Sequence, residues 1–355
     1  MQQRLERLRA ALSPMDALLI ASPSSRFYLS GFKGTAGTLF ITRDEAIYIA
    51  DGRYIEAVSQ QVRHMTVQLG GLPQTGKLAE LCAQHGVRRL GFEDREVTVA
   101  TYHQYQQALP GVELLPVDDL IVRMRMYKDA REIALIQQAQ DISDRAFLEV
   151  LDFVRAGRSE RDCAKVLEEA LFRHGAEALS FPTISVGGAR SSLPHGRPSD
   201  YVLRDGDFLT MDFGAVYGGY VSDMTRTFAI GRISDEMAHV YETVLRAQEA
   251  AIAAAKPGAL CSDIDRVARD VITEAGYGEY FSHSLGHSIG IDVHEEPRFS
   301  PTCQEVLQPG VCITVEPGIY LPGRFGVRIE DDILITQDGC RNFTAGPKAL
   351  CALRR

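Results

Sequence analysis

The second part of the chain contains one pattern twice, and any fold must accommodate both copies. Glycines end four helical stretches, two in each copy and at equal spacing: Gly157, Gly175, Gly258 and Gly276. The second helix of each copy begins with a predicted capping box, formed by Ser159 with Asp162 and by Ser262 with Asp265. Each copy then continues into a strand that is followed by a turn. The sequence therefore predicts two helices and a β-hairpin, used twice.

The first predicted hairpin is the stretch "DFLTMDFGAVYGGYVSDMTRTFAI", with its turn at residues 217–219. A hairpin centred between Tyr217 and Gly218 places Asp212 directly opposite Asp223 on one face of the sheet. Like charges in this arrangement destabilise a sheet unless another group compensates them.

The second predicted hairpin lies in "TVEPGIYLPGRFGVRIED" and is centred on Gly323. This register places Glu316 opposite Glu330, and strand alternation puts Arg328 on the same face as Glu330. Pro317 removes a donor from the ladder and could bend or shift this hairpin, so the second pairing is less secure than the first.

A single acidic residue of this kind is usually solvated on the surface. Two facing acid pairs in matched halves favour a different interpretation, because four carboxylates with one imidazole form a ligand set for divalent cations. The stretch "HSLGHSIGIDVHEEP" at residues 283–297 supplies several histidines. We therefore expect a centre that holds two metal ions.

Composition sets the outer limits of the fold. The chain has 355 residues, 45% of them hydrophobic, which suggests two domains. A net charge of −9 gives no footprint for nucleic acid. The cysteines form no C-x-x-C pair and are expected to be free thiols in a reducing compartment; they are Cys82, Cys163, Cys261, Cys303, Cys312, Cys340 and Cys351. The start of the chain is predicted to be an amphipathic helix and not a signal peptide, and no apolar run could span a bilayer, so we expect a cytoplasmic protein.

The pattern of elements changes near residue 125. Short strand-like runs such as "DALLIAS", "GTLFIT", "AIYIAD", "RRLGFED" and "VELLPV" alternate with helical stretches up to about residue 120, which is typical of an α/β domain with a mixed sheet. A long amphipathic helix follows within residues 126–157. We therefore expect one domain at 1–124 and a second at 125–355.

At this point the sequence resembles a known family. The stretches "MDFGAVYGGYVSDMTRT", "HSLGHSIGIDVHE", "TVEPGIY" and "GVRIED" are similar to the metal-site motifs of the pita-bread metallopeptidases, which include Xaa-Pro aminopeptidase, prolidase and methionine aminopeptidase. The resemblance covers essentially the whole chain. It implies an α+β fold in which a smaller creatinase-like α/β domain, 1–124, precedes a duplicated pita-bread catalytic domain, 125–355.

The resemblance also implies roles for individual residues. It implies that two metal ions are bound by Asp212, Asp223, His287, Glu316 and Glu330. It places four further residues on the substrate side of the site: His195, His283, His294 and Arg328. From the residues alone His195 could equally be a turn histidine, and His294 could be a core or surface residue that reaches the site only through a bend. His283 and His287 would share one face of a strand.

The expected mechanism is attack on a carbonyl by a water that two metal ions activate. Glu316 is the candidate for shuttling its proton to the leaving nitrogen. His294 and His195 would stabilise the developing oxyanion or hold the substrate, and Arg328 would orient Glu330. Ligation by carboxylates without thiolates suits Mn or Co, with Zn or Fe as alternatives.

The resemblance implies an exopeptidase that cleaves the bond before proline, and therefore peptide substrates with proline at the second position. Methionine aminopeptidases usually lack the N-terminal domain, and creatinase lacks this acid set. General similarity to compact bacterial members favours Xaa-Pro aminopeptidase as the main prediction. Prolidase (Xaa-Pro dipeptidase) is the alternative, since no motif separates the two, and a catalytically silent peptide-binding module on the same fold comes third. A homodimer is also implied.

Overall fold

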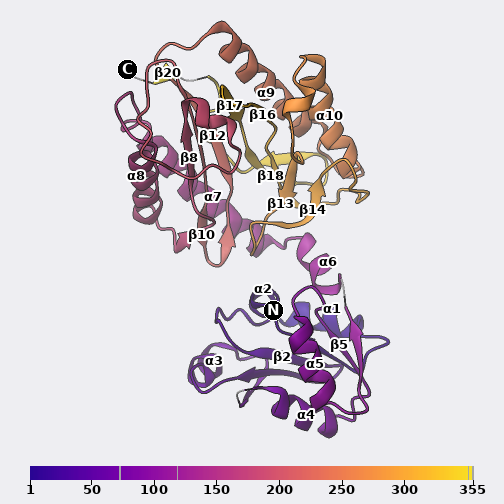
Figure 1. The fold of residues 1–355 in the computed structure, drawn as a ribbon. Helices are drawn as coiled ribbons and strands as arrows, with labels where there is room; N and C mark the ends of the chain where they lie inside the picture. The colour runs from indigo at the N-terminus through magenta and orange to yellow at the C-terminus, as the bar shows by residue number, and fades with distance from the viewer. Residues whose placement is uncertain (72, 118, 351, 354–355) are drawn as a thin grey trace. The chain divides into compact units, whose positions relative to one another are not determined.

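The computed structural model describes residues 1–71, 73–117, 119–350 and 352–353 (Figure 1). The chain divides into two compact units, Met1–Arg125 and Met126–Arg355. Cys351 lies outside the described residues, and the other cysteines are free thiols. Within the described part of the chain, every helix is too short or too polar to cross a membrane.

The first unit contains a mixed sheet of six strands in the order β4-β3-β2-β1-β5-β6. The strand β1 runs parallel to β5 and antiparallel to β2. Its strands are β1 (Ala17–Ile20), β2 (Thr38–Thr42), β3 (Ala46–Ala50), β4 (Thr66–Leu69), β5 (Arg89–Phe92) and β6 (Glu113–Pro116). Its helices are α1 (Gln2–Ala10), α2 (Pro23–Ser30), α3 (Ile55–Gln61), α4 (Thr75–Gln84), α5 (Val99–Ala108) and α6 (Leu120–Met126), the last of which reaches the unit boundary.

Each strand-like run predicted in this unit is a strand, so the mixed α/β sheet is confirmed. The prediction missed α2, although its signals were present. Ser22 caps it by accepting from the N–H of Ser25, Pro23 occupies its first turn, and Gly31 ends it with φ of 75°. It also missed β4, an edge strand whose residues are half-buried or exposed.

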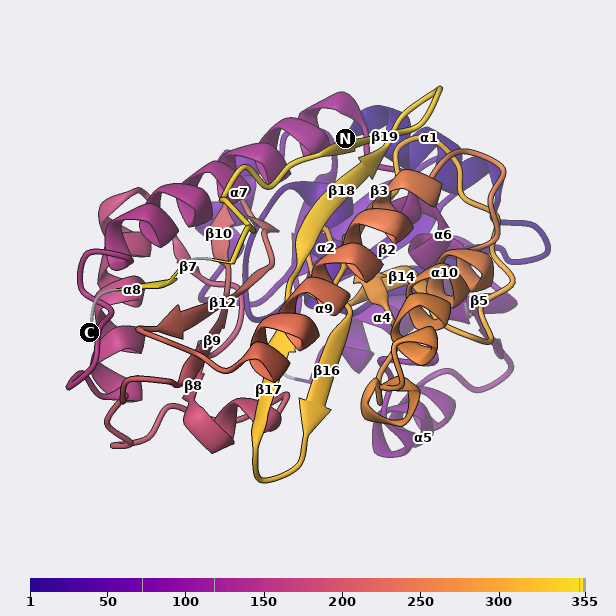
Figure 2. The ribbon, with the colours of Figure 1, turned by 90° about the horizontal axis from the view of Figure 1, so that it is seen from above.

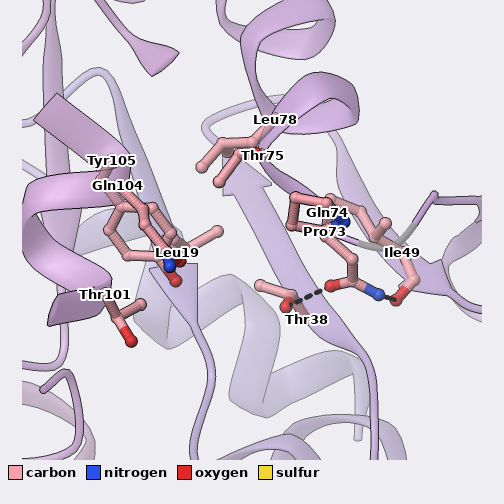
Figure 3. Close-up of a pocket in the computed structure, with 10 residues that line it drawn as sticks. All are labelled: Leu19, Thr38, Ile49, Pro73, Gln74, Thr75, Leu78, Thr101, Gln104 and Tyr105. Carbon is pink, nitrogen blue, oxygen red and sulfur yellow. Dashed lines mark hydrogen bonds between the residues drawn. The ribbon is translucent and has the colours of Figure 1, made fainter. Parts of the chain in front are cut away.

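A small cavity of about 210 Å³ lies between the sheet and the helices α4 and α5 (Figure 3). Gln74 crosses part of it, accepting from the Thr38 hydroxyl at 2.7 Å and donating to the Ile49 carbonyl at 3.3 Å. The amide of Gln74 therefore ties the start of α4 to strands β2 and β3, and the cavity is a feature of packing within this unit.

The second unit begins with the helices α7 (Ala130–Val150) and α8 (Glu160–Arg173). The strands of its first half are β7 (Ala178–Leu179), β8 (Ile184–Gly187), β9 (Phe208–Phe213), β10 (Ala215–Tyr217), β11 (Tyr220–Val221) and β12 (Met224–Ile230), with the short helix η1 (Gly188–Ser192) after β8. The helix α7 contacts α8 on one side and the β10–β11 hairpin on the other. The sheet of this half has the order β20-β12-β9-β8, where β20 is Ala352–Leu353.

The second half repeats this plan. Its helices are α9 (Asp235–Ala254) and α10 (Cys261–Glu274), followed by the short η2 (Gly278–Tyr280). Its strands are β13 (Gly286–Ser288), β14 (Glu295–Phe299), β15 (Cys312–Val315), β16 (Gly318–Leu321), β17 (Phe325–Arg328), β18 (Asp331–Ile335) and β19 (Cys340–Asn342). The helix α9 lies against β15, β16 and β17 (Figure 2). The predicted duplication of two helices and a hairpin is confirmed.

The two predicted capping boxes had different outcomes. Ser159 caps α8, accepting from the N–H of Asp162 at 3.1 Å. The box at Ser262 is wrong, because α10 begins two residues earlier than predicted, at Cys261, and Leu260 occupies its N-cap without a side-chain bond. Asp265 is instead buried, and it accepts hydrogen bonds from Arg269 and from the N–H of Leu285.

Candidate metal centre and substrate cavity

The first acid pair lies near the break between the β9–β12 ladder and the β10–β11 ladder. In the structure Asp212 on β9 is opposite Thr225 on β12, so the predicted direct pairing of Asp212 with Asp223 is wrong. The turn explains the shift. Gly218 and Gly219 both have positive φ, 56° and 87°, and together they form the two central positions of the hairpin. A turn centred one residue earlier would force Tyr217 into that left-handed region. Asp223 remains on the same face as Asp212, but diagonally across from it.

The second acid pair lies in the register that the sequence predicted. Gly318 pairs with Arg328 on β16 and β17, and Val315 pairs with Asp331 on β15 and β18. Both ladders share one register centred on Gly323, so Glu316 and Glu330 fall opposite each other between them. Pro317 interrupts the ladder without shifting it. The two acids therefore lie at a break where their side chains are not committed to a regular sheet.

Hydrogen bonds join the two acid pairs across the halves. The N–H of Glu330 donates to the Thr225 carbonyl at 3.1 Å, and the Thr225 hydroxyl donates to Oε2 of Glu330 at 2.6 Å. Arg328 donates through Nη2 to Oδ2 of Asp212 at 2.7 Å and through Nε to the Thr225 hydroxyl at 3.0 Å. Each half of the duplication thus holds the acids of the other in place.

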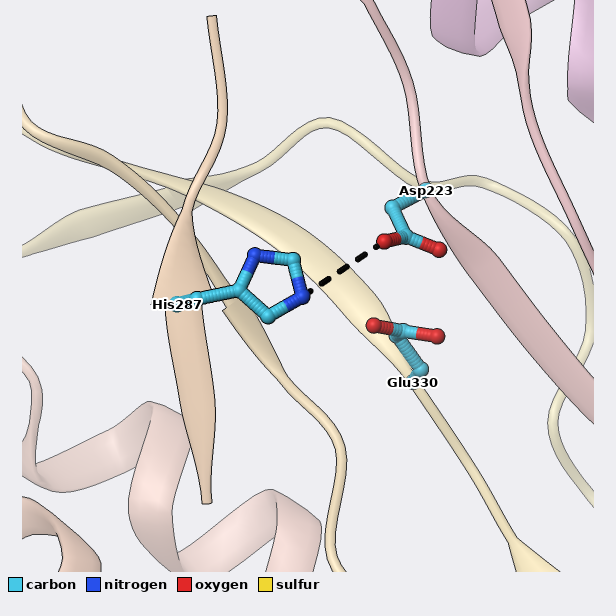
Figure 4. Close-up of side chains that lie close together, drawn as sticks. All are labelled: Asp223, His287 and Glu330. Atoms are coloured by element: carbon cyan, nitrogen blue, oxygen red, sulfur yellow. Dashed lines mark ion pairs between the residues drawn. The ribbon is translucent and has the colours of Figure 1, made fainter. Parts of the chain in front are cut away.

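His287 on β13 completes the group of acids (Figure 4). Its Nε2 lies 3.7 Å from Oδ2 of Asp223 and 3.4 Å from Oε1 of Glu316. Its Nδ1 lies 3.2 Å from the Ser288 carbonyl, which accepts a hydrogen bond from Nδ1–H, so the proton is on Nδ1 and Nε2 has a free lone pair. Burial and the neighbouring His294 lower the pKa of His287 to about 3, so the ring is neutral and able to bind a metal.

Burying these acids beside one another costs free energy, and a bound cation would remove that cost. Burial first, and then the neighbouring carboxylates, raise the pKa of Asp223 and of Glu330. Burial raises the pKa of Glu316 to about 8. For Arg328, burial by itself would lower the pKa, but Tyr320 and the surrounding carboxylates more than offset it and raise the pKa. One guanidinium therefore faces a larger number of buried acids.

These residues fit divalent cations. Ligand atoms of Asp223, His287 and Glu330 all lie within 4.8 Å of one another. Among the described residues, Oδ1 of Asp212 and Oε1 of Glu330 are buried without a hydrogen-bond partner. Orphaned carboxylate oxygens next to a neutral imidazole form an oxygen- and nitrogen-rich donor set without thiolate.

All nine residues singled out in the sequence line one cavity of about 840 Å³: His195, Asp212, Asp223, His283, His287, His294, Glu316, Arg328 and Glu330. His195 and His294 are exposed at its surface, and the rings of His294 and His287 lie 4.4 Å apart, edge to face. The expectation that His283 and His287 share a strand is wrong, because β13 begins only at Gly286. His283 lies in the irregular segment before it and still reaches the cavity. No described cysteine lines this cavity.

Sequence reasoning missed Tyr320. Its hydroxyl accepts from Nη1 of Arg328 at 2.8 Å and lies 3.0 Å from Nε2 of His283, so it links two of the predicted residues. Nδ1 of His283 lies 2.8 Å from the Ser284 carbonyl, which leaves Nε2 to accept the Tyr320 proton. Alternation along β16 gave no signal, because this contact is made across the hairpin by side chains. Arg298 on β14, which also lines the cavity, was missed as well.

The duplicated fold and the carboxylate and imidazole cluster define a class of metal-dependent hydrolases. Comparison with known families agrees. Residues 134–337 match the model for metallopeptidase family M24, and residues 4–127 match the Creatinase/Prolidase N-terminal domain. The chain belongs to metallopeptidase family M24, a family of enzymes that use two divalent metal ions. The predicted pita-bread fold with a creatinase-like N-terminal domain is confirmed.

Individual relatives are similar over almost their whole length. An Xaa-Pro dipeptidase from Bacillus anthracis is 40% identical with a TM-score of 0.96, covering 99% of each chain. An X-Pro aminopeptidase from Thermotoga maritima is 38% identical with a TM-score of 0.92, again over 99% of each chain. An Xaa-Pro dipeptidase from Pyrococcus horikoshii is 38% identical over 95% of this chain and 94% of its own.

Proposed function

We propose that this protein is a metal-dependent Xaa-Pro dipeptidase, a prolidase, which hydrolyses the bond between a residue and a following C-terminal proline. The observation that carries the hydrolytic part is the single cavity lined by the acids, the histidines and Arg328. The dipeptidase part is supported by the relatives from Bacillus anthracis and Pyrococcus horikoshii, which are named Xaa-Pro dipeptidases.

The sequence favoured the Xaa-Pro aminopeptidase, and the relatives support the alternative better. The aminopeptidase stays the second candidate because of the similar Thermotoga maritima enzyme. Both enzymes cleave the same kind of bond, and they differ in what the site accepts beyond proline. Neither proline substrate offers an N–H at the scissile nitrogen, so the site must hold the peptide by other groups.

The metal ions of the proposal would be held by five residues: Asp212, Asp223, His287, Glu316 and Glu330. Bound there, two divalent ions would supply Lewis acidity, lowering the pKa of a water and polarising the scissile carbonyl. We retain Mn or Co as the expected ions on the chemistry of the donors. The domain limits at 124 and 125, a homodimer and a cytoplasmic location also stay predictions from the sequence.

The protein groups divide the remaining work by position. Glu316 keeps 17% of its side chain exposed, against 12% for Asp212 and 6% for Asp223, so it is the acid best placed to pass a proton to the leaving nitrogen. His195 and His294 stand at the surface of the cavity, where they can hold the substrate or its developing oxyanion.

Arg328 connects one of the acids to the loop that carries His195. Its guanidinium holds Asp212 and Tyr320 and reaches the Pro194 carbonyl at 3.2 Å, next to His195. It therefore fixes a ligand acid and the loop of a substrate-side histidine with one rigid group. The sequence expected Arg328 to orient Glu330, and its direct ion pair is with Asp212.

The test compares two substrates on one enzyme preparation. The protein loaded with Mn or Co is incubated with Met-Pro and with Met-Pro-Gly-Gly, and free methionine is followed by mass spectrometry. Release from the dipeptide alone is expected. Release from the tetrapeptide would replace the proposal with the aminopeptidase, and silence on both with metal confirmed bound would favour the peptide-binding module. Asp212→Asn is the matched control, and it should lose bound metal by elemental analysis together with activity.

A further inference from the structure

A buried ion pair lies outside the set of residues that line the substrate cavity. The ammonium of Lys128 is 3.2 Å from Oε2 of Glu295, and the two residues are only 6% and 9% exposed. A lysine charge this deeply buried is costly unless it is paired. Neither residue lines the cavity, so any effect of this pair on the site must pass through the segment that Glu295 binds.

Glu295 holds a bend of the chain from inside. Residues 289–294 form a bend between β13 and β14. Oε1 of Glu295 accepts from the N–H of Ile291 at 2.8 Å and from the N–H of Asp292 at 3.1 Å. A Cβ at Gly290 would lie 2.6 Å from that same oxygen, so the glycine leaves the space that the carboxylate fills. The 289–294 bend is therefore folded around one carboxylate.

The 289–294 bend carries His294. Ser288 pairs with Glu295 where the bend closes, and the N–H of Val221 donates to the Gly290 carbonyl at 2.9 Å. The result is the edge-to-face contact between the rings of His294 and His287. Any loosening of the bend would move His294 relative to the metal-site imidazole.

The backbone of Lys128 is held in place, so its ammonium can anchor the carboxylate of Glu295. Its N–H donates to the Gly310 carbonyl at 2.8 Å, directly before β15. Asp129, the next residue, forms a complete capping box with Glu132 at the start of α7. The backbone of Lys128 is thus anchored on two elements while its ammonium reaches Glu295.

We infer that Lys128 and Glu295 are positioning residues for His294: the ion pair fixes the carboxylate that folds the 289–294 bend. The inference rests on the proposed function, which places His294 at the substrate. It assigns to the segment just before α7 a part in the geometry of the site. The chemistry itself stays with His294 and the metal-binding residues.

The first measurement does not depend on activity. In Lys128→Met the Glu295 carboxylate loses its ion pair with Lys128, and the amides of Ile291 and Asp292 should exchange hydrogen at least about tenfold faster than in the wild type, as expected for a local opening. Arg324→Met is the matched control, because it removes a positive charge from an exposed ion pair with Glu236 and should leave those amides unchanged. Unchanged exchange in Lys128→Met overturns the inference, whatever substrate the enzyme uses.

The second measurement is a double-mutant cycle with His294→Ala. Misplacing a catalytic group by a fraction of an ångström lowers kcat by about tenfold to 100-fold, so Lys128→Met should lower kcat while KM changes less. In the His294→Ala background Lys128→Met should cost no further kcat, because the group that it positions is already gone. An equal loss in both backgrounds would show a merely structural role and overturn the inference.

A second variant covers failure of Lys128→Met to fold. Glu295→Asp keeps the negative charge beside Lys128 but withdraws the carboxylate by one methylene from the amides of Ile291 and Asp292. The same faster exchange and the same dependence on His294 are expected. If His294→Ala keeps full activity on Met-Pro, the proposed role of His294 fails, and the exchange measurement still decides whether the ion pair folds the bend.

Discussion

At the scale of single residues, the site depends on a histidine that stays neutral. His283 is enclosed by Tyr320, Ser284 and the ring of Phe281. Burial first, and then the charge of Arg328, lower its pKa to about 4 from an ordinary value of 6.5. Only the neutral ring can accept the Tyr320 proton at Nε2, so its protonation would break the link to Arg328.

This pKa predicts a pH dependence of stability. Below pH 6.5 the unfolded chain takes up a proton at His283 that the folded chain refuses until about pH 4. The contribution of His283 is therefore complete above pH 6.5 and is lost as the pH falls toward 4, with a slope of at most about 1.4 kcal/mol per pH unit. Urea unfolding of chelated wild type and His283→Gln between about pH 4.5 and 7.5 should show this extra loss in the wild type alone. Parallel curves would contradict it.

Sequence reasoning found nine residues that line the cavity and missed those that connect them. Asp212, Glu316 and His287 were visible because their types and spacing carry chemistry. Thr225 and Tyr320 were not, since a hydroxyl in a strand is common and its partner is chosen by packing. The partners of the Thr225 hydroxyl lie more than 100 residues away in the chain, and those of Tyr320 lie 8 and 37 residues away. The choice between aminopeptidase and dipeptidase was also out of reach, as no motif carries it.

At the scale of elements, the first hairpin has a close approach between Gly214 and Ser222 that leaves no room for a side chain at position 214. A Cβ at Gly214 would lie 1.9 Å from the Ser222 carbonyl oxygen, so the two strands approach more closely there than any other residue allows. Asp212 and Asp223 lie on either side of this close approach. The turn sets the register of the two acids, and this close approach sets how near to each other their strands lie.

Gly214→Ala should therefore destabilise the protein by about 3 kcal/mol, because backbone must move to admit one methyl group. It should also reduce bound metal. Gly258→Ala is the control, since its φ of 85° strains an alanine by about 1 kcal/mol but its Cβ would meet nothing within 4 Å. Denaturant midpoints and elemental analysis measure both effects. Equal destabilisation by the two variants would contradict the steric role of Gly214.

The registers show what a sequence pattern can fix in a hairpin. The one centred on Gly323 was predicted correctly because a single glycine lies between symmetric strands. The other was misplaced by one residue because two adjacent glycines offered alternative turns, and the demand for positive φ at both decided between them. Likewise the missing cap at Ser262 follows from where Leu260 pairs with Val306, a contact between distant segments.

At the scale of the whole molecule, the proposed metal site is built from both halves of the duplication in the unit 126–355. Its acids repel one another in the absence of cations, and binding energy is therefore coupled to the folding of this unit. The first unit contains none of the residues that line the cavity. Metal should accordingly stabilise one unit and not the other.

Chelation should lower the melting temperature of the second unit. At a free metal concentration of 100 times Kd the ion contributes about 2.7 kcal/mol, which corresponds to about 5–10 °C for a unit of this size. Calorimetry with and without EDTA measures the shift. Asp212→Asn is the control, and its melting temperature should be the same with and without EDTA. A midpoint indifferent to EDTA in the wild type would contradict a bound metal.

The hydrogen bond between Thr225 and Glu330 joins two residues that are synthesised at different times. Its partners are separated by 105 residues. A ribosome that adds roughly 5–20 residues per second needs about 5–20 seconds to produce that stretch. Asp212 and Asp223 are made before that interval begins, and His287, Glu316 and Glu330 are added one after another during it. The proposed set of five metal-binding residues is therefore complete only when Glu330, the last of them, has been added.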